Sequence, residues 1–309
     1  MKRKAFIGIE TGGTKLQVVA GDDQAKILDR RRFLIDPKRG GKGICDQIES
    51  GLAELFASVT PIAAVVGFGG PVDWESGRVR CSHQVEGWSD FPFAEWLGEI
   101  VRTPVYVDND ANIAALAEAH QGAGARKNPV FYVTLGSGVG GGLVLDGHIF
   151  HGAKPGESEI GHVRLDRTGT LVEQRCSGWA VDHKIRELTK AHPGSKLAKL
   201  VGDSSGGEAR FMGKALAEQD ADAKKILSET AEDLAFGLSH VTHLMHPEVI
   251  VLGGGLSLIG EPLRTAVAGH LDRFVMEAFQ PRPEVKLSAL AEDVVPIGCL
   301  VAARQLVKS

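Results

Sequence analysis

The hydrophobic pattern of the chain alternates between two periods. Short apolar runs of strand length, most of them ending in glycine, are separated by longer stretches in which apolar residues recur at helical spacing. We predict strands at 5–10, 15–21, 63–70, 104–108, 130–136, 141–147 and 248–255, and helices at 45–58, 111–121, 179–191, 206–219 and 221–246. Strands that alternate with helices are typical of an α/β protein.

One pattern occurs twice. Residues 5–28, AFIGIETGGTKLQVVAGDDQAKIL, and residues 130–150, VFYVTLGSGVGGGLVLDGHIF, both predict a strand, a glycine-rich loop, a strand, an aspartate-containing turn and a third strand. In the second copy, Asp146-Gly147 indicates a hairpin, because both residues tolerate the positive φ angles of a type I′ turn. The repeat predicts two related units.

The stretch GSGVGG at 136–141 matches the G-x-G-x-x-G pattern of dinucleotide-binding domains. That fingerprint has to open a helix whose N-terminus receives the pyrophosphate. Here the stretch leads into GGLVLDGHIF, which predicts a β-ribbon, so the dinucleotide fold is the weaker alternative. The TGGTK stretch at 11–15 contains a lysine but lacks the G-x-x-x-x-G-K-[ST] frame of a P-loop.

Two glycine-rich hairpin turns can bring several backbone N–H groups together, and hydroxyl and ammonium groups accompany them here. We predict that these turns bind nucleotide phosphates; a pair of ordinary tight turns is the alternative. The residues concerned are Gly12, Gly13, Thr14, Lys15, Gly136, Ser137 and Gly138. A third cluster, Gly253, Gly254 and Gly255 in LGGGLS, is either a strand-to-helix turn or a surface for the adenosine.

The stretch VYVDNDANIAALAEA places polar side chains at a predicted strand-to-helix junction, namely Asp108, Asn109, Asp110 and Asn112. Phosphoryl transfer to a hydroxyl needs a group that accepts its proton, and a carboxylate at such a junction suits that role. We expect Asp110 to be this general base. The alternative is that Asp110 caps a helix beginning at residue 111.

These motifs together resemble the ROK family of sugar kinases and repressors, within the actin and hexokinase superfamily. IETGGTK, GFGGPVD, VDNDANIAALAE, LGSGVGGGLVLDG, ESEIGH and IVLGGG occur in the family's order over nearly the whole chain. The resemblance implies a two-domain actin-like ATPase (ribonuclease H-like) α/β fold with an active-site cleft between the domains. We expect a small domain of residues 1–118 plus 298–309 and a large domain of residues 119–297.

The resemblance also implies the chemistry. ATP with Mg²⁺ would phosphorylate the 6-hydroxyl of a hexose, and Asp110 would take the hydroxyl proton. Gly70, Gln84, Asn109, Asp110, Glu159, His162 and Glu173 would contact the sugar. Carboxylates, an amide and an imidazole suit the ring of donors and acceptors that a hexose presents. Glucose is our first expectation, with fructose, mannose and N-acetylhexosamines as alternatives, and the family suggests a homodimer.

The sequence departs from the family pattern in three places. Most members follow EIGH with a cysteine-rich segment that binds structural zinc, whereas HVRLDRTGTLVEQRCSGWA keeps Glu173 and offers only Cys176. We therefore expect no structural zinc. Gln84 stands where the family has a sugar-binding Asn, and Glu10 stands where many relatives have Asp. His240, His243 and His246 are interpreted as lying in the last turns of a helix that ends before Pro247. A metal site formed by these three imidazoles is the alternative.

Composition excludes some functions and leaves others open. The net charge of −4 over 309 residues gives no electrostatic support for nucleic-acid binding. We expect a cytoplasmic protein, because the start of the chain shows no secretory signal and no apolar run has membrane-spanning length. Because the phosphate loop begins by residue 10, we do not expect a repressor. A catalytically idle sugar sensor and an actin-like ATPase or chaperone module remain as alternatives.

Overall fold

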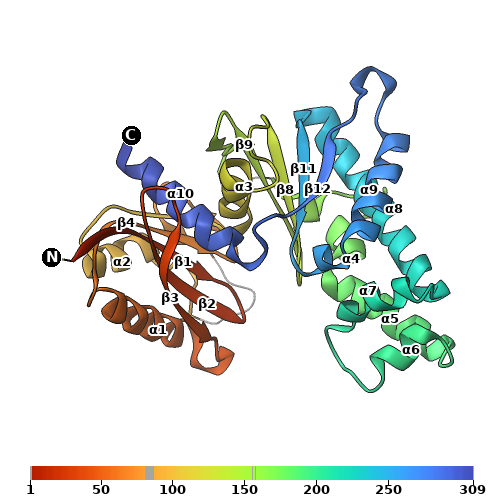
Figure 1. The fold of residues 1–309 in the computed structure, drawn as a ribbon, viewed down its shortest axis with the longest axis horizontal. Helices are drawn as coiled ribbons and strands as arrows, with labels where there is room; N and C mark the ends of the chain where they lie inside the picture. The colour runs from red at the N-terminus through yellow and green to blue at the C-terminus, as the bar shows by residue number, and fades with distance from the viewer. Residues whose placement is uncertain (1, 81–86, 155, 157, 309) are drawn as a thin grey trace. The chain divides into compact units, whose positions relative to one another are not determined.

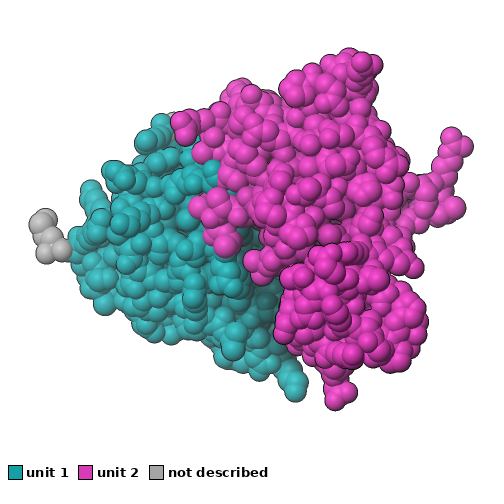
Figure 2. Space-filling view, turned by 45° about the vertical axis from the view of Figure 1, so that its right-hand side comes forward, with its two compact units in different colours: residues 1–122, 147–157, 292–309 teal, residues 123–146, 158–291 magenta. Residues whose placement is uncertain are grey.

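The computed structural model describes residues 2–80, 87–154, 156 and 158–308. The chain divides into two compact units, one of residues 1–122, 147–157 and 292–309, and one of residues 123–146 and 158–291 (Figure 2). Relative to the expected boundaries, unit 1 additionally contains residues 119–122, 147–157 and 292–297. The described residues form two mixed sheets of five strands, the first within unit 1 and the second mostly within unit 2.

The sheet of unit 1 has the order β3-β2-β1-β4-β7. Figure 1 labels its strands β1 to β4. Its strands are β1 (Arg3–Thr11), β2 (Lys15–Gly21), β3 (Ile27–Leu34), β4 (Val59–Phe68) and β7 (Val105–Asn109). The first three strands form an antiparallel meander, and β4 and β7 join β1 in parallel. A two-residue ribbon, β5 (Val72–Asp73) with β6 (Arg78–Val79), lies outside this sheet.

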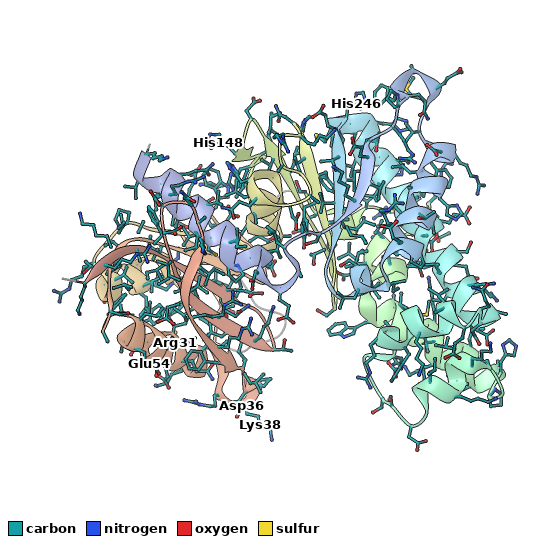
Figure 3. All side chains as sticks on the ribbon, in the orientation of Figure 1. Arg31, Asp36, Lys38, Glu54, His148 and His246 are labelled. Atoms are coloured by element: carbon teal, nitrogen blue, oxygen red, sulfur yellow. The ribbon has the colours of Figure 1, made fainter. Side chains whose placement is uncertain are left out.

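Four helices accompany this sheet: α1 (Gly40–Leu55), α2 (Phe93–Val101), α3 (Asp110–Gln121) and α10 (Val294–Lys308). Successive side chains of β1 point to opposite faces of the sheet, as in any pleated strand. Ile7 and Ile9 join the core that also contains Ile48 of α1 and Leu97 of α2, whereas Gly8 lies against α10. A short 3₁₀ turn (Pro37–Arg39) precedes α1, and the Asp36 side chain accepts from the Lys38 N–H there (Figure 3).

The second sheet has the order β10-β9-β8-β11-β12; β10 lies in the segment 147–157 of unit 1, and the other four strands belong to unit 2. Its strands are β8 (Val130–Leu135), β9 (Val139–Leu145), β10 (His148–Ile149), β11 (Val249–Gly253) and β12 (Glu284–Leu287). Its helices are α4 (Val172–Cys176), α5 (Gly178–Ala191), α6 (Lys196–Val201), α7 (Met212–Ala217), α8 (Ala221–Met245) and α9 (Glu261–Phe274). The two sheets share one topology, which agrees with the repeat in the sequence.

All seven predicted strands are present, and Asp146 and Gly147 both have positive φ, as a type I′ turn requires. Two of the predicted helices begin more than one residue from the predicted start. The helix expected at 45–58 starts at Gly40, and the one expected at 206–219 is a 3₁₀ turn (Glu208–Phe211) followed by α7. Gly206 and Gly207 have positive φ and cannot open an α-helix.

Strand β3 continues through Arg30, Arg31 and Arg32, where the apolar pattern predicts no strand. Alternate arginines point to opposite faces. The guanidinium of Arg31 bonds the carboxylate of Glu54 on α1 at 2.5 Å (Figure 3), whereas Arg30 and Arg32 both bond the buried Gln17 side chain on β2. Polar pairing therefore replaces hydrophobic alternation at this edge strand. Within the described residues, no helix is long and apolar enough to span a membrane.

Helix α10 packs close to the sheet and to α3 of unit 1, because glycines lie at both contacts. A β-carbon on Gly67 of β4 would lie 2.6 Å from Val295, and one on Gly298 of α10 would lie 2.0 Å from the Ile113 carbonyl oxygen. Neither position has space for a side chain. Close contact between α10 and α3 therefore depends on Gly298.

We expect Gly298→Ala to destabilise unit 1 by about 1–3 kcal/mol, because the added methyl group forces α10 away from the backbone of α3. Thermal and urea unfolding measure the change. Gly269→Ala is the matched control, since Gly269 lies in α9 and a β-carbon there meets nothing within 4 Å. That control should raise stability by about 0.5–1 kcal/mol. Equal stability of the two variants would contradict the packing role of Gly298.

Candidate active site

The parallel strands of unit 1 bring three loops together at one edge of the sheet. Thr11 of β1 pairs with Phe68 of β4, and Phe68 pairs with Asn109 of β7. The next residues along the chain are Gly12, Gly69 and Asp110. Because parallel strands end at the same edge, ligand-binding residues of α/β folds collect there. Strand register alone therefore places the glycine-rich loop beside the junction that carries Asp110.

Gly69 shows how close this approach is. A β-carbon on Gly69 would lie 3.2 Å from the Cα of Gly12 and 3.4 Å from Oδ2 of Asp110. The Gly69 N–H also donates to the Thr11 carbonyl at 2.8 Å. The sequence-predicted phosphate loop and the sequence-predicted base are thus neighbours within unit 1.

The side chain of Asn109 caps helix α3. Its Oδ1 accepts from the Ala111 N–H at 2.8 Å, and its Nδ2 donates to the Gly70 carbonyl at 3.2 Å. Asp110 is the first helical residue, so the alternative that Asp110 is the N-cap is wrong. Asn109 takes that position because its backbone is still extended, which lets the side chain reach forward to the free N–H groups. Asp110 is half-buried.

The loop between β1 and β2 is held by its flanking residues. The Gly12 N–H donates to the Lys15 carbonyl at 3.3 Å, and the Thr14 carbonyl accepts from the Ile35 N–H. The Lys15 ammonium lies 3.2 Å from the Glu10 carboxylate, which also accepts from Gln17 at 2.6 Å. Glu10 is therefore fixed beside the loop by two donors.

In unit 2, the second glycine-rich turn is anchored by Glu173. The Glu173 carboxylate accepts from the Val139 N–H at 2.9 Å, and a β-carbon on Gly138 would lie 2.5 Å from the same oxygen. The Gly136 carbonyl in turn accepts from the Gly178 N–H at the start of α5. The sequence assigned Glu173 to the sugar, whereas this contact gives it a part in shaping the turn.

A cavity of about 500 Å³ opens beside this turn within unit 2. It brings together Gly136 and Ser137 with Gly255, which comes from the LGGGLS stretch. The cluster is also a strand-to-helix turn, since β11 ends at Gly253 and a 3₁₀ helix (Gly255–Ile259) follows. Gly254 has φ +76° and packs against the Leu135 backbone, and Gly253 packs against Tyr132, so neither lines the cavity.

Sequence reasoning missed the other walls of this cavity, which are formed by Trp179, Asp182, Arg210, Leu258 and Ile259 among others. Trp179 is 65% exposed and Leu258 is 81% exposed, which is unusual for large apolar side chains. A flat, half-open apolar wall suits a nucleotide base. The tryptophan directly after Ser177-Gly178 could have indicated a binding surface, but the sequence does not show that its side chain is exposed.

Glu159 and His162 lie at the two ends of a short 3₁₀ turn (Ile160–His162) in unit 2. The imidazole Nδ1 of His162 is 3.6 Å from the Glu159 carboxylate, and both side chains are more than half exposed. The pair is therefore available to polar ligands. Gln84 lies outside the described residues.

A family model described as ROK family matches residues 6–305. The chain belongs to the ROK family. It is 29% identical to a glucokinase of Halalkalibacterium halodurans over 96% of this chain and 94% of that protein. It also resembles the structure of a ROK family glucokinase of Streptomyces griseus, solved with glucose and AMPPNP, with a TM-score of 0.84 and 28% identity over 97% of this chain and 99% of that one.

The structural similarity identifies the fold as the actin-like ATPase fold of the ROK sugar kinases. The fold is shared more widely than the activity. A ROK transcriptional regulator matches with a TM-score of 0.86 at 19% identity, and this chain covers 78% of it. Fold alone therefore does not distinguish kinases from regulators within the ROK family.

The described residues contain no group of three or more His, Cys, Asp or Glu side chains arranged around a metal. The three histidines at the end of α8 have other partners. His246 is labelled in Figure 3; it ends the helix and stacks on Phe279. His243 accepts from the Met276 N–H, and His240 packs against Phe236. Cys176, the one cysteine near the family's zinc segment, is buried, and burial raises the pKa of its thiol to about 12. Zinc binds the thiolate form.

We expect the purified protein to contain less than about 0.1 zinc per chain after exchange into metal-free buffer, because a closed tetrahedral site needs four ligands. Elemental analysis measures the content. We also expect treatment with a metal chelator to leave the thermal stability of the protein unchanged. About one tightly held zinc per chain would contradict the expectation.

We expect Trp179→Ala to weaken binding of a non-hydrolysable ATP analogue at least about fivefold, because base–aromatic stacking contributes about 1–3 kcal/mol. Titration calorimetry measures the dissociation constant. Leu244→Ala is the control, since Leu244 is 78% exposed on α8 and does not line the cavity. An unchanged affinity of Trp179→Ala for the ATP analogue would contradict stacking of the nucleotide base on Trp179.

Proposed function

We propose that this ROK family protein is an ATP-dependent hexose kinase that phosphorylates the sugar 6-hydroxyl, with glucose as the first candidate substrate. The observation that carries the proposal is the close approach of Gly12, Gly69 and Asp110 within unit 1. A carboxylate next to a glycine-rich loop suits a reaction in which a hydroxyl loses its proton while a phosphoryl group arrives.

Each residue then has a definite part. Asp110 accepts the proton of the attacking hydroxyl. Asn109 caps α3 through its Oδ1, and its Nδ2 donates to the Gly70 carbonyl. Glu159 and His162 offer an exposed carboxylate and imidazole to neighbouring sugar hydroxyls. The relatives that are named glucokinases support glucose over the other hexoses.

The residues present fit a nucleotide. The Gly136–Ser137 turn and Gly255 border a cavity large enough for a nucleoside, and Trp179 supplies an apolar face. Lys15 provides a positive charge beside the β1–β2 loop, where the charge of a transferring phosphoryl group is stabilised electrostatically. ATP with Mg²⁺ supplies the phosphoryl group and partly neutralises its charge.

Coupled measurement of ADP release separates this proposal from its rivals. The protein is assayed with ATP and Mg²⁺ alone and with glucose, fructose, mannose or N-acetylglucosamine. A kinase releases ADP only when its sugar is present. ADP release without sugar indicates an ATPase, and calorimetric sugar binding without any turnover indicates a regulatory sugar sensor.

We expect Asp110→Asn to lower kcat at least about a hundredfold, since general-base contributions are typically ~10²- to 10⁴-fold. ATP affinity and the thermal midpoint should change little, because Asn109 rather than Asp110 caps α3. Asp36→Asn is the control: Asp36 caps a different turn of unit 1 (Figure 3), so its loss of charge should leave kcat unchanged. Near-normal sugar phosphorylation by Asp110→Asn would rule out the proposed base.

A further inference from the structure

A buried polar cluster lies directly behind the proposed base. Asp108 is the penultimate residue of β7, and its side chain is only 2% exposed. It cannot reach a substrate from this position. Its contacts are therefore structural, and they stabilise the strand-to-helix junction that carries Asp110.

Among the described residues, four groups donate hydrogen bonds to the Asp108 carboxylate. Oδ1 accepts from the Asn109 N–H at 2.7 Å and from the Asn112 amide at 3.0 Å, which links β7 to the first turn of α3. Oδ2 accepts from the Tyr106 hydroxyl and from Nε2 of His151 at 2.8 Å. A buried carboxylate is stable only when donors replace its hydration, so each of the four partners holds it in place.

His151 comes from far along the chain, in the segment 147–157 that belongs to unit 1. The imidazole is 14% exposed and stacks on Trp74, with ring centroids 4.2 Å apart and 23° between the planes. The Lys154 ammonium lies near the carboxylates of Asp73 and Glu75, on either side of Trp74 in the chain. The segment is thus attached to residues 73–75 independently of Asp108.

We propose that His151 is a positioning residue for phosphoryl transfer: by donating from Nε2 to the Asp108 carboxylate, it fixes the Asn109–Asp110 turn. The inference rests on the proposed role of Asp110 as the base. His151 acts through Asp108 and does not touch the reacting atoms. Catalytic rates are sensitive to such displacement, because an error of about 1 Å can cost ~10²-fold.

The geometry allows a sharp pair of variants. In glutamine, Nε2 is separated from Cα by the same number of bonds as Nε2 of histidine, so His151→Gln can keep the donor to Asp108. In asparagine the amide is one bond shorter and cannot reach. The two variants have similar polarity and remove the Trp74–imidazole stack equally.

We expect His151→Asn to lower kcat about tenfold to a hundredfold, with the KM for ATP within about twofold of the unchanged protein. His151→Gln should recover most of that loss. Hydrogen exchange at the β7–α3 junction should be faster in His151→Asn than in His151→Gln. Equal kcat and equal exchange in the two variants would overturn the proposal.

Lys154→Ala is the control for loosening of the segment, because it removes the contacts to Asp73 and Glu75 and leaves the Asp108 contacts in place. Its kcat should stay within about twofold of the unchanged protein. A loss as large as that of His151→Asn would assign the effect to the segment's attachment and overturn the role of the hydrogen bond.

The order of the measurements separates this inference from the proposed function. The unchanged protein is first assayed for sugar-dependent ADP release, and absence of turnover with every hexose counts against the kinase. If the wild-type protein is active and Asp110→Asn is inactive, the results support Asp110 as the general base. Retention of full kcat by folded His151→Asn then overturns the positioning role alone.

Discussion

The register of three parallel strands is the constraint on which the proposed catalytic centre depends. Thr11, Phe68 and Asn109 are neighbours across β1, β4 and β7, so the residues that follow them emerge side by side. A slip of one residue in either pairing would turn the side chains of that strand to the opposite face and separate Asp110 from the glycine-rich loop. Such a slip is resisted because it would turn Ile7, Ile9 and Val66 toward α10, where Gly8 and Gly67 leave no space for side chains.

The two sheets share one topology, but different groups lie beside their glycine-rich turns. In unit 1, the β1–β2 loop lies beside a carboxylate that begins α3. In unit 2, the equivalent β8–β9 turn lies beside a cavity with an exposed tryptophan, and Glu173 holds the turn through the Val139 N–H. The shared backbone provides the close approach of glycine-rich turns, and the helices that follow the strands provide the specific groups.

The sequence predicted the existence of elements better than the details of the site. Runs such as AAVVGFGG and EVIVLGGG identify buried strands because their apolar residues can satisfy both faces of a parallel sheet. The repeat predicted a third strand after the aspartate-containing turn, but not the extension of β3 through Arg30–Arg32, whose side chains pair with Gln17 and Glu54. The helix expected at 206–219 starts only at Met212, because Gly206 and Gly207 have positive φ, and their N–H groups donate to the carboxylates of Glu208 and Asp182.

The sequence by itself determined the family, the α/β class, the duplicated hairpin and the residues that form the glycine-rich turns, because these depend on local conformational preferences and on the order of motifs. Tertiary structure alone decided that Asn109 rather than Asp110 caps α3, that Glu173 anchors a turn, and that Trp179 borders a cavity. It also decided that His151 meets Asp108 across 43 positions of sequence. Such contacts join residues that no periodicity links, so they arise only when packing brings distant segments together.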